Sequence, residues 1–446
     1  MIENADMLAT TELRRYALDI IEAGIRRVLP ANIMKSALSY DSAERMLSVM
    51  ENFYDLSGVR VFVIGGGKAS GLMAEALESI IPLDSIVAGV VNCKGGDYNA
   101  NKIRVAFAGH PIPDQRGVDG VRRMLALRDK YRINEKDLMI CLLSGGASAL
   151  MPCPVDGVSL EDKQRVTEIL LGSGAEIAEI NTVRKHLSRI KGGWLGHYYS
   201  PTTVVSLILS DVVGNDLATI ASGPTVADPS TFRDAYNVLE KYGLLARCPK
   251  SVISYLTKGC RGEVAETPKA LTNCHNYIIG DNRLALKAMY DRAIELGFCP
   301  LILSSEQKGE TNAAALQRAG EILNSKYAGY DALLMGGETT PRLSANAGKG
   351  GRNQHYAAAS MLAMENYPGQ WLVASIGTDG SDFLPDVAGA IVDKDTVERA
   401  RAKGLNMRDY LDRFDSYSLL KAIGGSLVVT GDTGTNVGDI ALYLLA

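Results

Sequence analysis

Short runs of apolar and β-branched residues recur along most of this chain, and helical stretches separate them. The runs are Val61–Ile64, Ile86–Val91, Leu138–Leu143, Thr203–Leu209, Leu301–Leu303, Ala332–Met335, Trp371–Ile376 and Leu427–Thr430. Continuous apolar runs are typical of strands that are covered on both faces of a parallel sheet, and their alternation with helices favours an α/β architecture. Because 446 residues are too many for one ordinary core, the pattern predicts at least two α/β domains.

Two segments indicate how the chain is divided. Residues 11–29 carry apolar side chains at helical spacing, which predicts an amphipathic helix that ends at Pro30. The segment Ala221–Pro229 contains two prolines and precedes a predicted helix at Asp234–Tyr242, so we place the domain boundary there. We expect a larger N-terminal domain at residues 1–235 and a smaller C-terminal domain at 236–446, and leave open whether the tail 430–446 rejoins the first domain.

Charge and composition exclude several classes of protein. A formal net charge of −4 offers no basic face for nucleic acid. No apolar run approaches the roughly 20 residues that span a bilayer, and the acidic segment Met1–Asp6 is unlike a secretory signal. Seven scattered cysteines without a C-x-x-C pair disfavour a disulfide framework or a zinc site. We therefore expect a cytoplasmic protein with no nucleic-acid or membrane partner, and leave a homodimer open.

Six of the predicted strands end in loops of glycine and small polar residues. The loops span residues 65–70, 144–148, 210–216, 336–340, 377–382 and 431–436. In open α/β sheets, ligands bind beyond the carboxyl ends of the strands, where backbone N–H groups of glycine-rich loops approach anions closely. One such loop is more often a tight turn, but six of them predict a shared anion-binding site.

Lys68 follows the triplet Gly65–Gly67 and is the first candidate for neutralising phosphate charge. The loop is not a Walker A motif, which requires glycine where Phe62 stands and serine or threonine where Ala69 stands. It also departs from the dinucleotide fingerprint, because Ser70 occupies the third glycine position. The alternative is an exposed lysine at a helix start, an unfavourable place for a cation.

Carboxylates in or beside these loops suggest metal-assisted phosphate chemistry. Mg²⁺ binds one or two carboxylates together with phosphate oxygens and water, and phosphoryl transfer also uses a carboxylate that accepts the proton of the attacking hydroxyl. We favour Asp211, Glu338 and Asp379 for these roles. Asp216 and Asp382 are equally well explained as helix caps.

Basic residues provide further candidates. Arg352 lies in the glycine-rich segment Gly348–Gln354, where a planar guanidinium can bind phosphate or carboxylate through two hydrogen bonds. Arg184, Lys185 and Arg189 form a second group, and their spacing lets only some of them share one helix face. His186, within that group, is better explained as a packed or capping histidine than as a general base.

Long segments of the sequence resemble the second class of glycerate kinases, whose C-terminal domain is called MOFRL. The resemblance runs from about residue 60 to the C-terminus and includes EINTVRKHLS at residues 179–188, GKGGRNQ at 348–354 and TGTNV at 433–437. It implies an α/β protein of two domains, a larger Rossmann-like three-layer α/β/α domain and a smaller MOFRL-type domain at about residues 330–440. It also implies a cleft between them and transfer of the γ-phosphate of ATP to D-glycerate, which gives 2-phosphoglycerate.

The resemblance further implies a set of site residues and cofactors. Lys68, Arg352 and Asp211 correspond to catalytic positions. Substrate and nucleotide binding is expected of Gly65, Gly66, Gly67, Ser144, Gly145, Gly146, Ser148, Arg184, Asn215, Glu338, Asn353, Asp379, Asp386, Thr435 and Asn436. Mg²⁺ or another divalent cation would be held by Asp211, Asp379 and Glu338, with ATP as co-substrate.

Three alternatives stay open at this point. A kinase of this class that forms the 3-phosphate would use the same residues. An NAD(P)H-dependent hydroxypyruvate reductase is disfavoured by the incomplete dinucleotide fingerprint at Gly65–Ser70. A sensor that binds nucleotides or sugar acids without turnover is a third reading, because the fold alone does not determine the function.

Overall fold

The computed structural model describes residues 1–344 and 346–446 of the chain. It divides into two compact units, which we call unit 1 (Met1–Asn32 with Gly280–Ala446) and unit 2 (Ile33–Ile279). Within the described residues, no helix combines the length and the apolar character that a membrane crossing requires. The predicted cleft between two domains stays a prediction, and each unit is described by itself.

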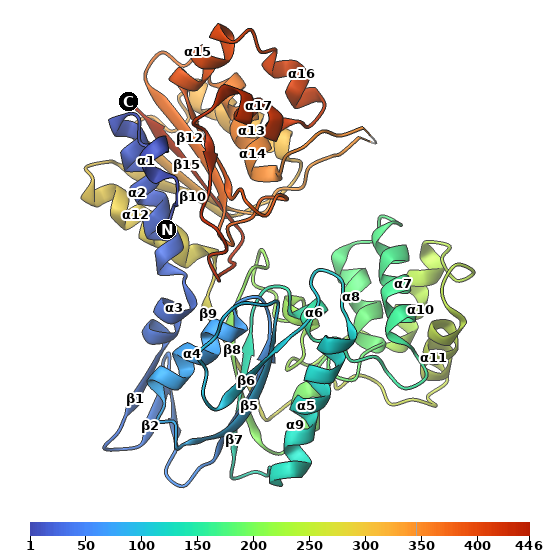
Figure 1. The fold of residues 1–446 in the computed structure, drawn as a ribbon. Coiled ribbons are helices and arrows are strands. Elements are labelled where there is room, and N and C mark those ends of the chain that lie inside the picture. The colour runs from blue at the N-terminus through green and yellow to red at the C-terminus, as the bar shows by residue number, and fades with distance from the viewer. Residues whose placement is uncertain (345) are drawn as a thin grey trace. The chain divides into compact units, whose positions relative to one another are not determined.

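Unit 2 is built around a six-stranded sheet with the order β6-β5-β4-β7-β8-β9. The strands are β4 (Val61–Gly66), β5 (Ile86–Cys93), β6 (Ile103–Phe107), β7 (Leu138–Leu143), β8 (Thr203–Leu209) and β9 (Cys274–Gly280). The pairings among β4 to β8 are all parallel. Helix α4 (Ser70–Ile80) lies on one side of the sheet, and α5 (Gln115–Tyr131) and α9 (Trp194–Tyr199) lie on the other (Figure 1). This arrangement confirms the three-layer α/β/α prediction.

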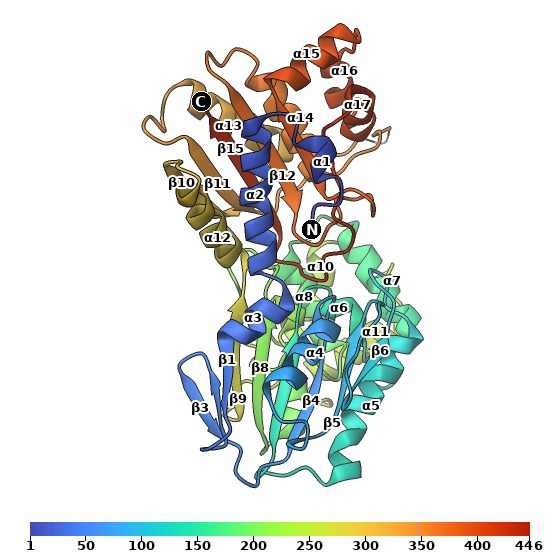
Figure 2. The same ribbon diagram turned by 60° about the vertical axis from the view of Figure 1, so that its left-hand side comes forward.

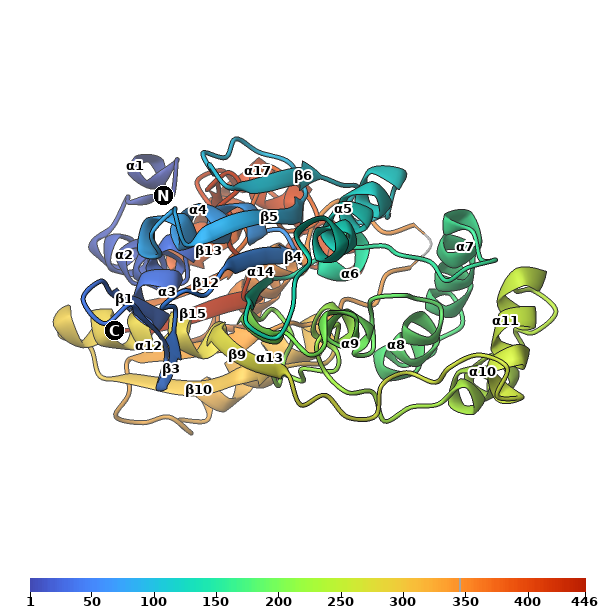
Figure 3. The same cartoon turned by 90° about the horizontal axis from the view of Figure 1, so that it is seen from below.

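The remaining elements of unit 2 surround this sheet. Helix α3 (Pro30–Ala37) leads into a small antiparallel sheet of β1 (Leu38–Asp41), β2 (Met46–Val49) and β3 (Asn52–Asp55). A short helix α6 (Ala147–Leu150) follows β7, and a 3-10 turn η1 (Ile220–Ser222) follows β8. Four helices, α7 (Leu160–Leu171), α8 (Ile177–His186), α10 (Phe232–Lys241) and α11 (Lys250–Cys260), form a cluster with its own apolar core. Figure 3 shows this cluster at the opposite end of the unit from β1 and β3.

Unit 1 contains a mixed sheet with the order β10-β11-β15-β12-β13-β14. The strands are β10 (Pro300–Gln307), β11 (Ala332–Gly337), β12 (Trp371–Gly377), β13 (Gly389–Asp393), β14 (Leu427–Val428) and β15 (Asp439–Leu445). Only the pairing of β10 with β11 is parallel among these described strands. The prediction of a parallel sheet is therefore wrong for this unit, because β15 enters antiparallel between β11 and β12.

Helices cover both faces of the unit 1 sheet. On one face lie α1 (Ala5–Leu8), α2 (Glu12–Arg27) and α12 (Asn282–Glu295), and Figure 2 shows α2 running beside α12 across the strands. On the other lie α13 (Thr311–Leu323), α14 (Arg352–Ala363), α15 (Lys394–Ala402), α16 (Met407–Asp412) and α17 (Ser416–Ile423). Helix α2, from the start of the chain, thus completes the fold of the C-terminal part of the chain.

The division between the units differs from the predicted boundary. Residues 235 and 236 fall inside α10, which packs against α8 and α11 within unit 2, so the chain does not change unit there. The proline-bearing segment before α10 is an internal loop, tied down by the N–H groups of Gly192 and Gly193, which donate to the carbonyls of Ser222 and Gly223. The tail does not rejoin the first domain, since β15 pairs with β11 and β12. Pro30 does not simply end a helix either: it is the first residue of α3, where its missing N–H costs no hydrogen bond.

Candidate functional site

Three of the glycine-rich loops lie at one edge of the unit 2 sheet. They follow β4, β7 and β8, which are neighbours and run parallel. Their carboxyl ends therefore meet at the edge where ligands bind in open α/β sheets. The structure brings together there the predicted residues Gly65, Gly66, Gly67, Lys68, Ser144, Gly145, Gly146, Ser148, Asp211 and Asn215.

The loop that carries Lys68 is held in place by the loop after β7. The Lys68 N–H donates to the carbonyl of Gly145 over 2.8 Å, and the next N–H, of Ala69, donates to the Ser144 hydroxyl over 3.0 Å. Gly67 has a φ of +146°, and a Cβ there would stand 2.1 Å from the Ser144 hydroxyl oxygen, so this crossing requires glycine. Ser144 is buried and positions the Lys68 loop.

Other side chains border the loop after β7. A Cβ on Gly146 would lie 2.9 Å from His110 Nε2 and 3.3 Å from Lys68 Cγ, so both side chains are beside it. Further along, the hydroxyl oxygens of Ser148 and Ser222 are 2.8 Å apart. Sequence reasoning did not identify His110, because it lies after β6, a half-buried strand whose apolar run was not recognised.

The loop after β8 contains both a candidate ligand residue and a structural one. Asp211 is the second residue after the strand, and Asn215 adopts a φ of +56° in the turn that comes next. Asp216 closes a turn and does not cap a helix: its carboxylate accepts hydrogen bonds from the Ala218 N–H over 3.1 Å and from the Thr219 hydroxyl over 2.5 Å, and η1 begins only at Ile220. These contacts give Asp216 a local structural role and leave Asp211 as the candidate of this loop.

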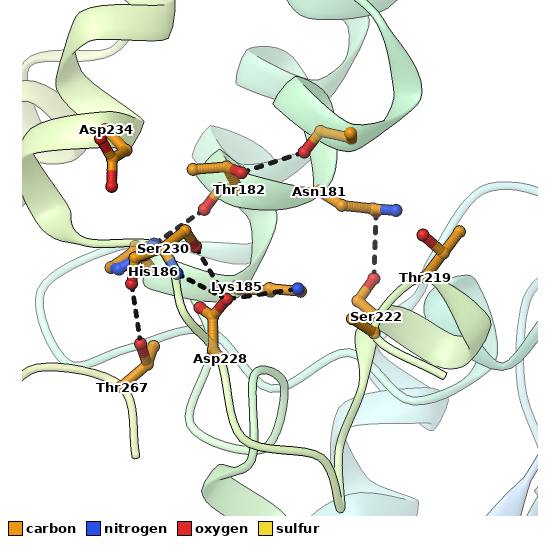
Figure 4. Close-up of polar contacts among 12 residues, drawn as sticks. Asn181, Thr182, Lys185, His186, Thr219, Ser222, Asp228, Ser230, Asp234 and Thr267 are labelled. Atoms are coloured by element: carbon orange, nitrogen blue, oxygen red, sulfur yellow. Dashed lines mark hydrogen bonds and ion pairs between the residues drawn. The ribbon is translucent and has the colours of Figure 1, made fainter. Parts of the chain in front are cut away.

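The basic group at the end of α8 separates into residues with different surroundings (Figure 4). Lys185 pairs with buried Asp228 over 3.3 Å, and Arg189 pairs with an exposed carboxylate over 3.4 Å. Arg184 instead lines a pocket next to Ser148. In the part of the chain that the structure describes, Arg184 makes no hydrogen bond or ion pair, and burial lowers the pKa of its guanidinium.

His186 is a packed histidine, as its sequence context indicates. Its Nδ1 lies 2.8 Å from the Thr182 carbonyl and its Nε2 lies 2.8 Å from the Glu266 carboxylate, with the ring edge against Phe232. Both ring nitrogens are thus engaged in fixing α8.

The other three loops meet at one edge of the unit 1 sheet. Asp439, the first residue of β15, is in register with Gly337 at the end of β11 and with Gly377 at the end of β12. The loops 336–340, 377–382 and 431–436 therefore adjoin at this edge. The six loops thus form two groups of three, one in each unit.

Arg352 is the first residue of α14 and lies in an acidic environment. Its Nε and Nη2 donate to the two carboxylate oxygens of Asp439 over 2.6 and 3.0 Å, and its Nη1 is 3.0 Å from Glu338. Burial opposes the charge, but the two carboxylates outweigh it and raise the pKa of the guanidinium. The side chain remains about one third exposed, so one face of the guanidinium is accessible from solvent.

Asn353 and Asp382 hold the start of α14. Asn353 Nδ2 donates to Asp439 over 2.9 Å, and the backbone N–H groups of Asn353 and Gln354 donate to Asp382 over 3.0 and 2.8 Å. Gly351 permits this approach, because a Cβ there would stand 2.1 Å from the Asp382 carbonyl oxygen. Asp382 is therefore a helix cap, and burial raises the pKa of its carboxyl to about 6.

The remaining predicted residues of unit 1 are placed as follows. Asp379 accepts hydrogen bonds from the N–H and hydroxyl of Ser381, both over 3.0 Å. The Thr435 hydroxyl is buried and donates to the carbonyl of Val28, and Asn436 accepts from the Gly438 N–H. Asp386 is exposed and makes no hydrogen bond or ion pair with the residues described. Arg352 and Asn353 thus contact Asp439 directly, and Glu338 contacts Arg352. Asp386 lies outside this network.

Besides His110, sequence reasoning missed three further polar residues of these sites, which are Asp439, Lys163 and Lys191. Asp439 directly follows a glycine and begins a buried strand, and that position was its only sequence signal. Lys163 and Lys191 flank the recognised basic group and line the same pocket as Arg184. Nothing in the local pattern separates them from exposed lysines.

A metal site was predicted at Asp211, Asp379 and Glu338. Among the described residues, no group of three or more His, Cys, Asp or Glu side chains is arranged to hold a metal ion. Glu338 also pairs with Arg352. A single carboxylate or a pair remains compatible with Mg²⁺ that is bound mainly through phosphate and water.

Two family models match the chain. DUF4147, described as a domain of unknown function, matches residues 16–257, and the MOFRL family matches residues 331–439. The first covers the sheet of unit 2 up to β8, and the second covers most of the mixed sheet of unit 1.

The chain is also similar to characterised and solved proteins over nearly its whole length. It is 39% identical to a glycerate 2-kinase of Pyrococcus horikoshii, over 96% of this chain and 98% of that protein. It is 39% identical to a putative hydroxypyruvate reductase of Agrobacterium vitis, over 91% of each chain. A crystal structure of a glycerate kinase from Thermotoga maritima matches with a TM-score of 0.84 at 37% identity, over 97% of this chain and 99% of that one.

Proposed function

This chain belongs to the DUF4147 and MOFRL family of glycerate kinases, and from that premise we propose that it transfers the γ-phosphate of ATP to D-glycerate to give 2-phosphoglycerate. One observation carries the proposal. The similarity to a protein named glycerate 2-kinase covers 96% of this chain and therefore extends through both units, in which the candidate cations Lys68 and Arg352 lie.

The surroundings of Lys68 support a role in binding phosphate. Lys68 stands at the carboxyl end of β4, just before α4 begins. The N–H groups of Gly67, Lys68 and Ala69 all donate to other segments of unit 2, so an anion here would meet the ammonium group of Lys68 and the start of α4 rather than the amides of the loop. A helix N-terminus favours an anion, and an adjacent ammonium group adds a full positive charge. Lys68 then stabilises the charge that develops on the transferred phosphoryl group, where preorganised cations have their largest effect.

In the proposed reaction, the 2-hydroxyl oxygen of glycerate attacks the γ-phosphorus while the bond to the β–γ bridging oxygen of ATP breaks. The hydroxyl proton passes to a carboxylate, for which we propose Asp211. Arg352 binds phosphate or carboxylate oxygens through the exposed face of its guanidinium, with Asp439 and Glu338 fixing its orientation. Catalysis is then mainly positioning and charge stabilisation.

Mg²⁺ enters this proposal with the nucleotide substrate. Bound to the phosphates of ATP, the cation supplies further neutralising charge. We propose Asp211, Asp379 and Glu338 as the carboxylates available to it, with most ligands coming from phosphate and water.

The experiment is an assay of ADP release with D-glycerate, ATP and Mg²⁺, with the product passed to enolase without a mutase. We expect ADP release and immediate enolase turnover, which requires 2-phosphoglycerate. ADP release without enolase turnover would replace the 2-phosphate by the 3-phosphate. No ADP release with glycerate or related hydroxy acids would contradict the kinase.

A second candidate function is NAD(P)H-dependent reduction of hydroxypyruvate, because a similar protein carries the name putative hydroxypyruvate reductase. Ser70 stands where the dinucleotide fingerprint has its third glycine, and its buried hydroxyl donates to the Leu142 carbonyl over 3.3 Å. We therefore expect no quenching or enhancement of NAD(P)H fluorescence on titration with the protein. Saturable binding with oxidation of NAD(P)H by hydroxypyruvate would favour the reductase.

A further inference from the structure

Unit 2 contains a small pocket that is lined by two buried lysines and a partly buried arginine. It has a volume of about 140 Å³ and lies against α7, α8 and the segments at Pro111–Pro113 and Lys191. Lys163 projects into it from α7, Arg184 from α8, and Lys191 from the loop before α9. Lys191 is 2% exposed and Lys163 is 8% exposed, so their ammonium groups are withdrawn from water.

None of these cations has a carboxylate partner within the described parts of the chain. Lys163 Nζ donates to the Leu187 carbonyl over 2.9 Å, and Lys191 Nζ donates to the Ala221 carbonyl over 3.3 Å. Glu168, at the margin of the pocket, pairs with Arg165 on the exposed side of α7 instead. The contrast with Lys185 is informative, because that neighbour of Arg184 is equally buried and is paired with Asp228.

This arrangement is electrostatically unfavourable without a bound anion. Desolvation lowers the pKa of Lys163 to about 7 and also lowers the pKa of Lys191, with repulsion from Arg184 adding to both. Burial of an uncompensated charge costs several kcal/mol, whereas an anion in the pocket would restore the balance. A cluster of like charges around a cavity is thus a candidate ligand site.

Contacts around the pocket hold the cations in place. Figure 4 shows Lys185 bonded to Asp228, and the hydroxyl of Ser222 donating to Asn181 on the same helix over 3.2 Å. His186 is bonded at both ring nitrogens. Arg184 therefore projects from a helix that is fixed on both sides of it, which reduces the entropy lost when it binds a ligand.

The pocket is connected to the Lys68 loop by a single short segment. Ser148 is in the wall of the pocket, and its loop begins with Ser144 and Gly145, which hold Ala69 and Lys68 through hydrogen bonds. A ligand in the pocket would thus lie next to the segment that positions the candidate phosphate-binding lysine.

We propose that this pocket binds the carboxylate of the acceptor hydroxy acid, with Arg184 as the group that recognises it and Lys163 and Lys191 as supporting cations. The proposal rests on the kinase function proposed above. A three-carbon acid matches a pocket of this size, whereas whole nucleotides need several hundred Å³. The planar guanidinium of Arg184 suits a carboxylate, and the hydroxyl of Ser148, in the wall of the pocket, is at hand for a hydroxyl of the acid. This assignment leaves Arg352 for phosphate.

The kinetic test compares four single variants with the wild-type enzyme. We expect Arg184→Met and Lys163→Met to raise the KM for D-glycerate about 10- to 100-fold, as for a lost hydrogen bond to a charged group. The KM for ATP at saturating glycerate should change less than about threefold. Arg184→Lys should recover part of the loss, because it restores charge without the planar fork.

Arg189→Met, a neighbouring cation outside this pocket, is the matched control and should leave both KM values unchanged. An unchanged KM for glycerate in both Met variants, or a selective rise in the KM for ATP, would overturn the assignment.

A binding measurement separates this proposal from the kinase function. D-glycerate should raise the melting temperature of the wild-type protein without ATP, glycerol should not, and the effect should vanish in Arg184→Met. That result would support the proposal that the pocket binds the carboxylate of the acid, even if no ADP were released. Equal stabilisation of wild type and Arg184→Met by glycerate would overturn the assignment of this pocket. Stabilisation by inorganic phosphate but not by glycerate would also overturn it, because the ligand would then be phosphate.

Discussion

Lys68 and Arg352 are both candidate phosphate-binding cations, but their surroundings differ. Lys68 is positioned through its backbone, by Gly145 and by the N–H of Ala69 on Ser144. Arg352 is positioned through its side chain, which forms a bidentate pair with Asp439 and a contact with Glu338. Removal of either cation should impair catalysis, and the loss of Arg352 also leaves a half-buried acidic pair without its partner.

We therefore expect Lys68→Ala to lower kcat at least about 100-fold. Arg352→Ala should lower kcat to a similar extent and also destabilise the protein by about 1–3 kcal/mol, because Asp439 loses two hydrogen bonds. ADP release and thermal unfolding measure the two effects. Lys136→Ala, at an exposed lysine, is the control. Near-normal turnover in both variants would contradict the catalytic assignments.

Asp382 provides a test through pH. Burial raises the pKa of its carboxyl to about 6, above the ordinary value of about 3.9 in an unfolded chain. Between these values the folded state holds a proton that the unfolded state has lost, so the contribution of Asp382 to the free energy of unfolding falls as pH rises from 4 to 6. Asp382→Asn cannot ionise and should lack this dependence.

The measurement is urea unfolding of unit 1, followed by the fluorescence of buried Trp371 in a Trp194→Phe background. The difference in unfolding free energy between the parent and Asp382→Asn should change by about 1–3 kcal/mol between pH 4 and pH 7. Asp386→Asn, at an exposed carboxylate, should give a difference that does not vary with pH. A pH-independent difference for Asp382→Asn would show that its pKa is not raised.

At the scale of elements, local sequence identified the most apolar strands, missed others such as β6, β13 and β15, and did not reveal which strands pair. The central strands β7 and β8 were predicted with their observed bounds, because apolar residues fill both faces of a covered parallel strand. The position of β15 between β11 and β12 depends on contacts between residues far apart in the chain, which no local pattern encodes. The same reason explains why Asp439 was missed while Arg352, in a recognisable glycine-rich segment, was found.

Helix α2 shows how a single residue attaches an element. Arg14 is fully buried, and its guanidinium donates to Asp393 over 2.5 Å, to Thr396 over 2.9 Å and to the Gly425 carbonyl over 2.7 Å. Asp393 in turn caps α15 by accepting from the Thr396 N–H. This network joins the N-terminal helix to the far edge of the unit 1 sheet.

Arg14→Met should destabilise unit 1 by about 3–5 kcal/mol, because it leaves the buried Asp393 carboxylate without its charge partner. Thermal or urea unfolding followed by Trp371 measures the effect. Arg15→Met, at the next and exposed position, is the matched control and should change the unfolding free energy by less than about 0.5 kcal/mol. Equal stabilities of the two variants would mean that Arg14 is not what anchors α2.

At the scale of the whole molecule, the chain begins in unit 1, passes through unit 2 and returns to unit 1. Sequence periodicity identified the first helix but gave no sign of the sheet that it covers. Ile20, Ile21 and Ile25 are at most 1% exposed in α2, which packs on α12 and on β12 and β15. The C-terminal segment therefore lacks part of its core until residues from the start of the chain are added.

This path leads to a prediction about fragments. Residues 280–446 expressed alone should expose the sheet face that α2 covers and should aggregate or remain loosely packed, because a large apolar patch would face water. Co-expression with residues 1–32 should restore a soluble complex in which Trp371 is shielded and unfolding is cooperative. The Arg14→Met form of the short fragment should restore it less well, since Asp393 would stay unpaired.

Near-ultraviolet circular dichroism, which reports fixed packing around Trp371, distinguishes the outcomes. A native-like spectrum with cooperative unfolding for residues 280–446 alone would mean that α2 covers the sheet without being required for its fold.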